Sequence, residues 1–196
     1  LDDDASLSCG SLAGEYEVLG ELAAGSFATI YTAEHRVLRR RAAIKVPRVT
    51  TPETMYRLNR EARAMSVIRH PSIVDIYDSG SLPGGRPYFV MELLDGVTLE
   101  TMLGERGRLI PSAAYELVEP IFGALAAAHD AGIVHQDIKP SNIFVAKTGV
   151  KLLDFRLAKL LRPQRWEPDR TRVWEWTGTP AVMAPEQFLG GDVDAR

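Results

Sequence analysis

The sequence predicts an α+β fold in which short strands come first and longer helices follow. Between residues 16 and 93, short apolar runs alternate with turn signals, as strands and their connections do. Residues 52–69 and 112–131 instead repeat apolar side chains at helical spacing. A polar loop followed by two short apolar runs, within residues 134–156, indicates a β-hairpin. With 45% hydrophobic and 25% charged residues, the 196-residue chain can bury a substantial core.

Residues 1–14 are predicted to be an acidic, flexible leader, because they combine aspartates with small residues. The chain's single cysteine, Cys9, lies in this stretch, so no intrachain disulfide can form and a reducing compartment is expected. The sequence starts without methionine and shows no signal peptide. We therefore expect it to be a piece of a longer protein.

The next elements bring a lysine and a glutamate together. Residues 16–22 and 29–33 are predicted strands around the turn Ala-Ala-Gly-Ser-Phe-Ala, and residues 42–46 form the following strand with Lys45 in it. In the helix predicted over 52–69, Glu61 borders the apolar face. A carboxylate at that border is costly to bury alone, so Lys45 is its expected partner.

Two further strands and a second helix lead to the polar loop. Residues 73–77 and 88–93 are predicted strands joined by a turn-rich segment, after Pro71 has ended the first helix. The helix of residues 112–131 begins at a Pro-Ser start signal and is apolar enough to be a core helix. Its end delivers the chain to residue 134.

The strongest functional signal is in residues 134–156. Asp137, Lys139, Asn142 and Asp154 alternate there with two apolar runs. Because a hairpin folds its two ends together, Asp154 is expected to return close to Asn142. Two acids, an amide and a lysine in one site can hold Mg2+, face phosphate with a cation and orient a hydroxyl. A solvated polar loop, the alternative, would not require this order and spacing.

These patterns resemble the motifs of protein kinases. Residues 135–142 follow the catalytic-loop pattern H-R-D-x-x-x-x-N except at Gln136, and residues 154–156 follow D-F-G except at Arg156. Residues 184–186 match A-P-E. A lysine two positions after the loop aspartate, followed by proline, is typical of the serine/threonine branch. The general pattern is similar to that of bacterial serine/threonine kinases of the eukaryotic-like type.

The resemblance implies a two-lobed fold. Residues 15–92 would form the N-lobe, an antiparallel five-stranded sheet with one helix. Residues 93–196 would form an incomplete, mainly helical C-lobe with the hinge, the catalytic loop and the activation segment. We therefore expect a kinase domain truncated after the A-P-E motif.

The resemblance also assigns roles to single residues. Asp137 would orient the substrate hydroxyl and accept its proton, while Lys139 would neutralise charge on the moving phosphoryl group. Lys45, held by Glu61, would contact the α- and β-phosphates of ATP. The implied metal ligands are Asn142 and Asp154. The implied nucleotide contacts are Leu22, Gly25, Ile30, Ala43, Lys45, Glu92, Leu94 and Phe144, with Met91 as gatekeeper.

The leading interpretation is ATP-dependent phosphoryl transfer to serine or threonine of a protein, with Mg2+ as cofactor. Departures from the family pattern keep a nucleotide-binding pseudokinase or scaffold with little turnover as the alternative. Gln136 replaces an arginine, Arg156 replaces a glycine, and Ala23 and Ala28 replace two glycines of the G-x-G-x-x-G loop.

A third interpretation is an interaction fragment that exposes three tryptophans in an otherwise polar segment. Packing of the tryptophans on the chain's own helices is the favoured interpretation of this segment. They are Trp166, Trp174 and Trp176.

Composition limits the partners. A net charge of -3 gives no electrostatic case for nucleic acid, and the arginine cluster within residues 36–41 is short and interrupted. No apolar run approaches the roughly 20 residues that a membrane-spanning helix needs. We expect ATP and a protein substrate as partners, no nucleic acid, no membrane segment in this chain and a cytoplasmic location. The resemblance leaves room for a membrane tether elsewhere in the parent protein.

Gln136 leads to a prediction about regulation. In the kinase family the arginine at this position gathers a phosphate on the activation segment, so its loss predicts weak dependence on phosphorylation of Thr171 or Thr177. Changing both threonines to alanine should lower phosphoryl-transfer activity by less than about tenfold, which corresponds to roughly 1.4 kcal/mol of barrier. A larger decrease in the measured rate would contradict the prediction.

Overall fold

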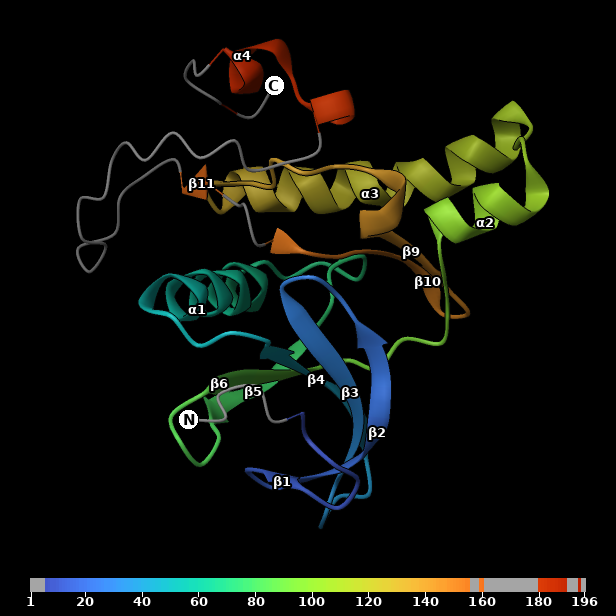
Figure 1. Ribbon diagram of the computed structural model, residues 1–196. Helices are drawn as coiled ribbons and strands as arrows, with labels where there is room; N and C mark the ends of the chain where they lie inside the picture. Colours follow the sequence, from blue (N-terminus) through green and yellow to red (C-terminus); the bar gives the residue numbers. More distant parts are fainter. Residues whose placement is uncertain (1–5, 156–158, 161–179, 190–193, 195–196) are drawn as a thin grey trace. The chain divides into compact units, whose positions relative to one another are not determined.

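The computed structural model describes residues 6–155, 159–160, 180–189 and 194 (Figure 1). The chain divides into two compact units. The first comprises Leu1–Ser66 and Val74–Asp95, and the second comprises Val67–Ile73 and Gly96–Arg196.

The first unit is one antiparallel sheet with one helix. Its strands are β1 (Leu12–Ala13), β2 (Tyr16–Ala24), β3 (Ala28–His35), β4 (Arg41–Pro47), β5 (Ile76–Ser81) and β6 (Pro87–Met91). They lie in the order β1-β2-β3-β4-β6-β5, and the helix is α1 (Pro52–Val67). The predicted α+β class with an antiparallel sheet and one helix is confirmed for this unit.

Alternation along the strands divides the apolar side chains between two clusters. Ile44 and Val46 of β4 join the larger one, with Tyr31 of β3 and Val90 of β6. The smaller cluster holds buried residues of α1 against Phe89 of β6. Because successive strand residues face opposite sides, Lys45 points away from the larger cluster and toward Phe89.

The observed sheet has six strands, one more than the five that were predicted. Leu12 and Ala13 belong to the stretch predicted as a flexible leader, yet they form β1 and pair with β2 at Glu17 and Tyr16. Ala13 is 1% exposed, and Leu7 also packs against the larger cluster. A two-residue strand has no periodicity that a sequence could display. The end of the predicted leader is therefore part of the folded sheet.

Strand β5 begins later than predicted. The sequence suggests a strand over residues 73–77, whereas β5 runs from Ile76 to Ser81. Ile73 instead forms an isolated parallel bridge with Leu152 in the second unit. Its burial therefore reflects a different partner, which the local apolar pattern could not reveal.

The second unit combines helices with short strands. Its helices are α2 (Leu99–Arg106), α3 (Pro111–Asp130), α4 (Pro185–Phe188) and the 3-10 turns η1 (Pro140–Asn142) and η3 (Pro180–Val182). Its strands are β7 (Gly96–Thr98), β8 (Ile133–Val134), β9 (Ile143–Ala146), β10 (Gly149–Leu152) and β11 (Lys159–Leu160). The hairpin β9–β10 follows the sequence prediction, with Ile143 opposite Leu152.

Strand β7 and helix α2 were not anticipated from the sequence. β7 pairs with β9 so closely that a Cβ on Gly96 would lie 2.1 Å from the carbonyl oxygen of Val145. Only glycine permits that approach. Thr98 then caps α2, since its hydroxyl accepts a hydrogen bond from the amide of Thr101.

Helix α3 is the predicted core helix. Ile121, Ala124 and Ala128 are buried along one face, while Phe122 and Tyr115 are 62% and 67% exposed. The helix packs against β8 and β10, so it supports both ends of the segment that carries the candidate chemistry.

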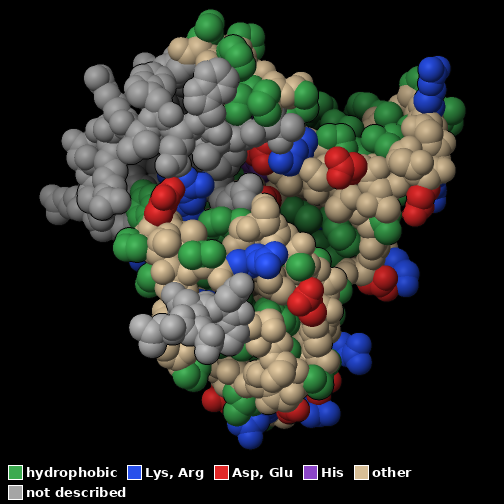
Figure 2. Space-filling model, viewed as in Figure 1, with side chains coloured by type: hydrophobic (Ala, Val, Ile, Leu, Met, Phe, Trp, Pro, Cys, Tyr) green, Lys and Arg blue, Asp and Glu red, His purple; other side chains and the backbone are tan. Residues whose placement is uncertain are grey.

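Two observations bear on partners. None of the helices in the described part of the chain has the length and apolarity needed to span a bilayer. On the face shown in Figure 2, acidic and basic side chains are intermingled.

Substitutions in β1 test whether the predicted leader belongs to the fold. Ala13→Asp would bury a carboxylate and should lower the free energy of unfolding by about 3 kcal/mol. Leu12 is 48% exposed, so Leu12→Asp should change it by at most about 0.5 kcal/mol. Urea denaturation measures both. An effect of Ala13→Asp of no more than about 0.5 kcal/mol would contradict the burial of Ala13 in the folded sheet.

Candidate active site

A buried ion pair joins β4 to α1. The Nζ of Lys45 lies 2.5 Å from the Oε1 of Glu61, and their side chains are 12% and 2% exposed. The lysine ammonium also lies 5.7 Å from the centre of the Phe89 ring. Since an unpaired charge here would be costly, the pair holds the ammonium in one place. This is the partnership that the sequence predicts.

The turn between β2 and β3 carries the glycine-poor loop. Gly25 closes the turn by donating its amide to the carbonyl of Ala28, at 2.9 Å. Ala28 is already a strand residue, 6% exposed and paired with Pro47. Of the predicted nucleotide contacts on these strands, Leu22 is 53% exposed and Ile30 is half-buried.

Other predicted nucleotide contacts of the first unit lie on or beside β4 and β6. Ala43 is 2% exposed and pairs directly with Met91 across the two strands. Glu92 and Leu94 follow Met91 and are half-buried, and the amide of Glu92 donates to the carbonyl of Asp75 at 2.9 Å. The structure thus brings Ala43 and the predicted gatekeeper together.

In the second unit, two polar side chains contact the carboxylate of Asp137. The Oδ2 of Asp137 accepts a hydrogen bond from the Nδ2 of Asn142 at 3.1 Å and forms an ion pair with the Nζ of Lys139 at 2.9 Å. Asn142 Nδ2 also donates to the backbone carbonyl of Asp137 at 2.8 Å. Asp137 and Asn142 are 3% and 6% exposed. The carboxylate therefore has a defined orientation.

His135 joins this loop to the end of β10. Its Nδ1 accepts the amide hydrogen of Asp137 at 3.2 Å, so the ring proton belongs on Nε2, which donates to the carbonyl of Leu153 at 2.8 Å. The ring meets Phe155 edge to face, with centroids 4.6 Å apart. Burial lowers the pKa of His135, and Lys139 adds to this effect, while the bond to Leu153 and the nearby aspartates oppose it. The imidazole is thus neutral at physiological pH.

The hairpin brings the predicted metal ligands to one end. The amide of Leu153 donates to the carbonyl of Asn142 at 2.8 Å, so Asp154 directly follows a residue bonded to Asn142. With Asn142 Nδ2 turned toward Asp137, its Oδ1 remains as a possible metal ligand. An amide oxygen and a carboxylate are oxygen ligands of the kind that Mg2+ takes, alongside water and phosphate. The donor set therefore fits Mg2+.

Of the remaining predicted residues, Phe144 lies in the described part of the chain and several others lie outside it. Phe144 lies on β9, half-buried and opposite Lys151. Within the described ranges, no group of three or more histidine, cysteine, aspartate or glutamate side chains could hold a metal ion. Outside the described residues lie Arg156, Trp166, Thr171, Trp174, Trp176 and Thr177.

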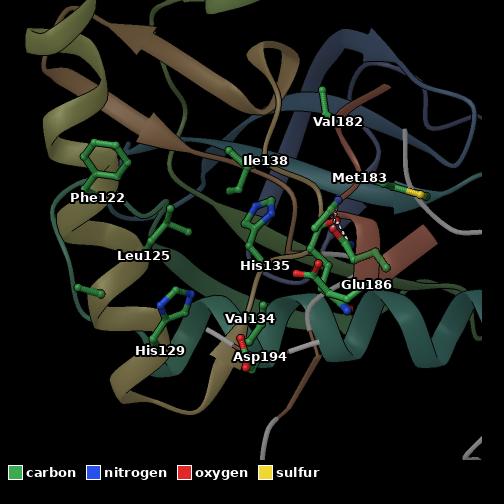
Figure 3. Close-up of a pocket in the computed structure, with 14 residues that line it drawn as sticks. Phe122, Leu125, His129, Val134, His135, Ile138, Val182, Met183, Glu186 and Asp194 are labelled. Carbon is green, nitrogen blue, oxygen red and sulfur yellow. Dashed lines mark hydrogen bonds between the residues drawn. The ribbon is translucent and has the colours of Figure 1, made fainter. Parts of the chain in front are cut away.

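A cavity of about 530 Å3 lies beside the catalytic-loop segment of the second unit (Figure 3). Its walls come from α3, from residues 134–138 and from residues 182–187. Gln187 lines it and contacts the backbone of Gln136. This contact was not anticipated from the sequence, where the only signal is a glutamine three residues after a helix N-cap.

A family model described as "Protein kinase domain" matches residues 16–194. "Serine/threonine-protein kinase Pkn1" of Myxococcus xanthus is 38% identical over 191 residues, covering 93% of this chain and 27% of the relative. "Serine/threonine-protein kinase PknL" of Mycobacterium tuberculosis is also 38% identical, and the match covers 94% of this chain and 46% of that relative. The chain thus spans between about a quarter and about half of these relatives.

A third relative and a solved structure give the same picture. "DNA damage-responsive serine/threonine-protein kinase RqkA" of Deinococcus radiodurans is 40% identical over 194 residues, covering 94% of this chain and 28% of the relative. The crystal structure of the Mycobacterium tuberculosis PknI kinase domain matches with a TM-score of 0.70 and 25% identity, covering 97% of this chain and 71% of that one.

The buried imidazole predicts a pH dependence of stability. Because burial lowers the pKa of His135 below 6.5, the unfolded chain takes up this proton at higher pH than the folded chain does. The stabilisation is complete above pH 6.5 and is lost as the pH falls toward the lowered pKa, by up to about 1.4 kcal/mol per pH unit. Urea denaturation between pH 7.5 and 5.5 should show this slope, and His135→Asn should lack it. Parallel curves for the two proteins would contradict the assignment.

Proposed function

Because this chain belongs to the protein kinase family, we propose that it transfers the γ-phosphoryl group of ATP to a serine or threonine hydroxyl of a protein. One observation carries the proposal, namely the carboxylate of Asp137 held by Asn142 and Lys139. A buried carboxylate in a fixed orientation can accept a hydrogen bond from a substrate hydroxyl and then take its proton.

Lys139 supplies positive charge beside that base. Its ammonium lies 2.9 Å from Asp137 and its side chain is 22% exposed, so it is partly accessible while still held. A phosphoryl group transferred near Asp137 would meet this cation as negative charge develops on its oxygens. Preorganised charge of this kind is a large term in phosphoryl transfer, since the protein does little covalent chemistry.

The nucleotide and metal contacts belong to the same proposal. Mg2+ would be held by Asn142 and Asp154, and when bound it neutralises charge on the phosphate oxygens. Lys45, oriented by Glu61, would contact the α- and β-phosphates. The remaining ATP contacts would be Leu22, Gly25, Ile30, Ala43, Glu92, Leu94 and Phe144.

The relatives support an active enzyme, since those compared above are named serine/threonine-protein kinases. Among the residues that the structure describes, Asp137, Lys139 and Asn142 keep mutual contacts suited to catalysis. No observation on the described residues favours the pseudokinase alternative.

We further propose a cytoplasmic setting, in keeping with a single, exposed cysteine.

Replacement of Asp137 tests the function directly. Asp137→Asn retains an acceptor for Asn142 and Lys139 but cannot take a proton, so phosphoryl transfer should fall by about 100-fold or more. The rate of phosphate transfer from Mg-ATP to a protein substrate measures it. Asp130→Asn, at an exposed position at the end of α3, is the matched control and should retain the rate. Unchanged transfer by Asp137→Asn, or ATP binding without transfer by the unsubstituted protein, would exclude the proposal.

A further inference from the structure

We infer that Gln187 is a positioning residue for the catalytic loop, and this inference rests on the function proposed above. Its side chain holds the backbone at Gln136, the residue immediately before Asp137. Through that backbone, Gln187 controls the orientation of the catalytic carboxylate.

Two hydrogen bonds define the side chain of Gln187. Its Nε2 donates to the carbonyl oxygen of Gln136 at 2.9 Å, and its Oε1 accepts the amide hydrogen of Ala184 at 3.1 Å. A side-chain amide has one donor end and one acceptor end. Because the two neighbours are a carbonyl and an N–H, only one orientation of the amide satisfies both. The contact is therefore directional.

The backbone that Gln187 holds is in an unfavourable conformation. Gln136 has a φ of 68°, in the left-handed region, where a side chain other than glycine costs about 1–2 kcal/mol. In the described part of the chain only Arg39 and Asp154 share this property among residues other than glycine. A residue in this region keeps its conformation only when surrounding contacts hold it.

The conformation of Gln136 determines where Asp137 lies. The amide of Asp137 donates back past residue 136 to the Nδ1 of His135, at 3.2 Å. If residue 136 relaxed to a right-handed or extended conformation, this bond would break and the carboxylate of Asp137 would turn. The bond from Gln187 to the Gln136 carbonyl opposes that relaxation.

The surroundings strengthen the contact. Gln136 and Gln187 are both half-buried and line the cavity of about 530 Å3, together with apolar residues such as Val134 and Met183. Water competes less for a hydrogen bond in such surroundings than at an open surface. A carbonyl left without its donor there would carry a desolvation cost.

A purely structural role can be separated from the positioning role. Ala184 has no hydroxyl with which to cap α4, so Gln187 also serves the start of this short helix. Gln187→Glu has the same size and keeps the acceptor for the Ala184 amide, but it places a carboxylate against the Gln136 carbonyl. Gln187→Met removes both contacts. The glutamate variant therefore removes the bond to the loop alone.

Kinetics with Mg-ATP and a protein substrate, measured on the native polypeptide, test the inference. Gln187→Glu should lower kcat by about tenfold, with KM for ATP within about twofold and a smaller decrease in melting temperature than Gln187→Met, because it keeps the bond to the Ala184 amide. Gln187→Met should lower kcat equally and also lower the melting temperature. A role confined to capping α4 predicts a normal kcat for the glutamate variant.

Substitution of Gln136 provides a rescue test. Asparagine accepts left-handed φ more readily than glutamine, whereas valine resists it strongly. In the Gln187→Glu background, Gln136→Asn should recover kcat by about threefold or more, and Gln136→Val should lower it further. A helix-capping role would give no dependence on the residue at position 136.

The outcomes distinguish the inference from the proposed function. If the unsubstituted protein transfers phosphate and Gln187→Glu retains its kcat, the inference is overturned and the function stands. If the unsubstituted protein transfers no phosphate, the function fails and hydrogen exchange of residues 135–142 decides the inference. Faster exchange in Gln187→Glu than in the unsubstituted protein supports it, and equal exchange overturns it.

Discussion

The neutral imidazole of His135 connects the two stretches on which the candidate chemistry depends. It accepts the amide hydrogen of Asp137 and donates its own proton to the carbonyl of Leu153, the residue before Asp154. Only a ring with one donor and one acceptor nitrogen can do both, because a protonated ring would direct a second N–H at the amide of Asp137. Burial to 1% exposure lowers the pKa of His135 and so maintains this state. The neutral imidazole therefore joins the loop of Asp137, the proposed base, to the end of β10 beside Asp154, a proposed metal ligand.

The two hydrogen bonds of His135 help to hold a strained backbone on either side of it. Gln136 and Asp154 have φ values of 68° and 60°, and each is adjacent to a residue that is bonded to His135. Such conformations persist when several contacts hold them at once, and here the bond from Asn142 to the Asp137 carbonyl and the bond from Leu153 to the Asn142 carbonyl add to those of the imidazole. Phosphoryl transfer depends on positioned charges more than on covalent participation. A loop whose strained geometry is determined by several hydrogen bonds suits that requirement.

The sequence could predict those features that a local pattern makes physically necessary. The pairing of Lys45 with Glu61 was predictable because a carboxylate on the buried edge of a helix needs a cation, and the hairpin was predictable because its turn and apolar runs are contiguous. Strand β1 was not, since two residues show no period. The strand predicted to begin at Ile73 was placed too early, because Ile73 is buried in a bridge to Leu152 and not in a strand of the first unit. The contact of Gln187 with Gln136 joins positions 51 residues apart through a backbone carbonyl, which leaves no signature in the residue type at 136.

The glycine-poor turn illustrates how a departure from a family motif can be compatible with the family fold. At Gly25 the amide donates to the Ala28 carbonyl, and a Cβ there would lie 3.2 Å from that oxygen, a close approach. Ala23 and Ala28 occupy positions that already belong to strands, paired with Ile30 and Pro47. A methyl group at a paired strand position leaves the backbone free to follow the sheet, and at Ala28 it adds to a buried surface. The retained glycine thus lies at a close approach within the turn, whereas the two replaced glycines lie at paired strand positions. The two strands thus keep their pairing around the turn, although two of the family's three glycines are absent.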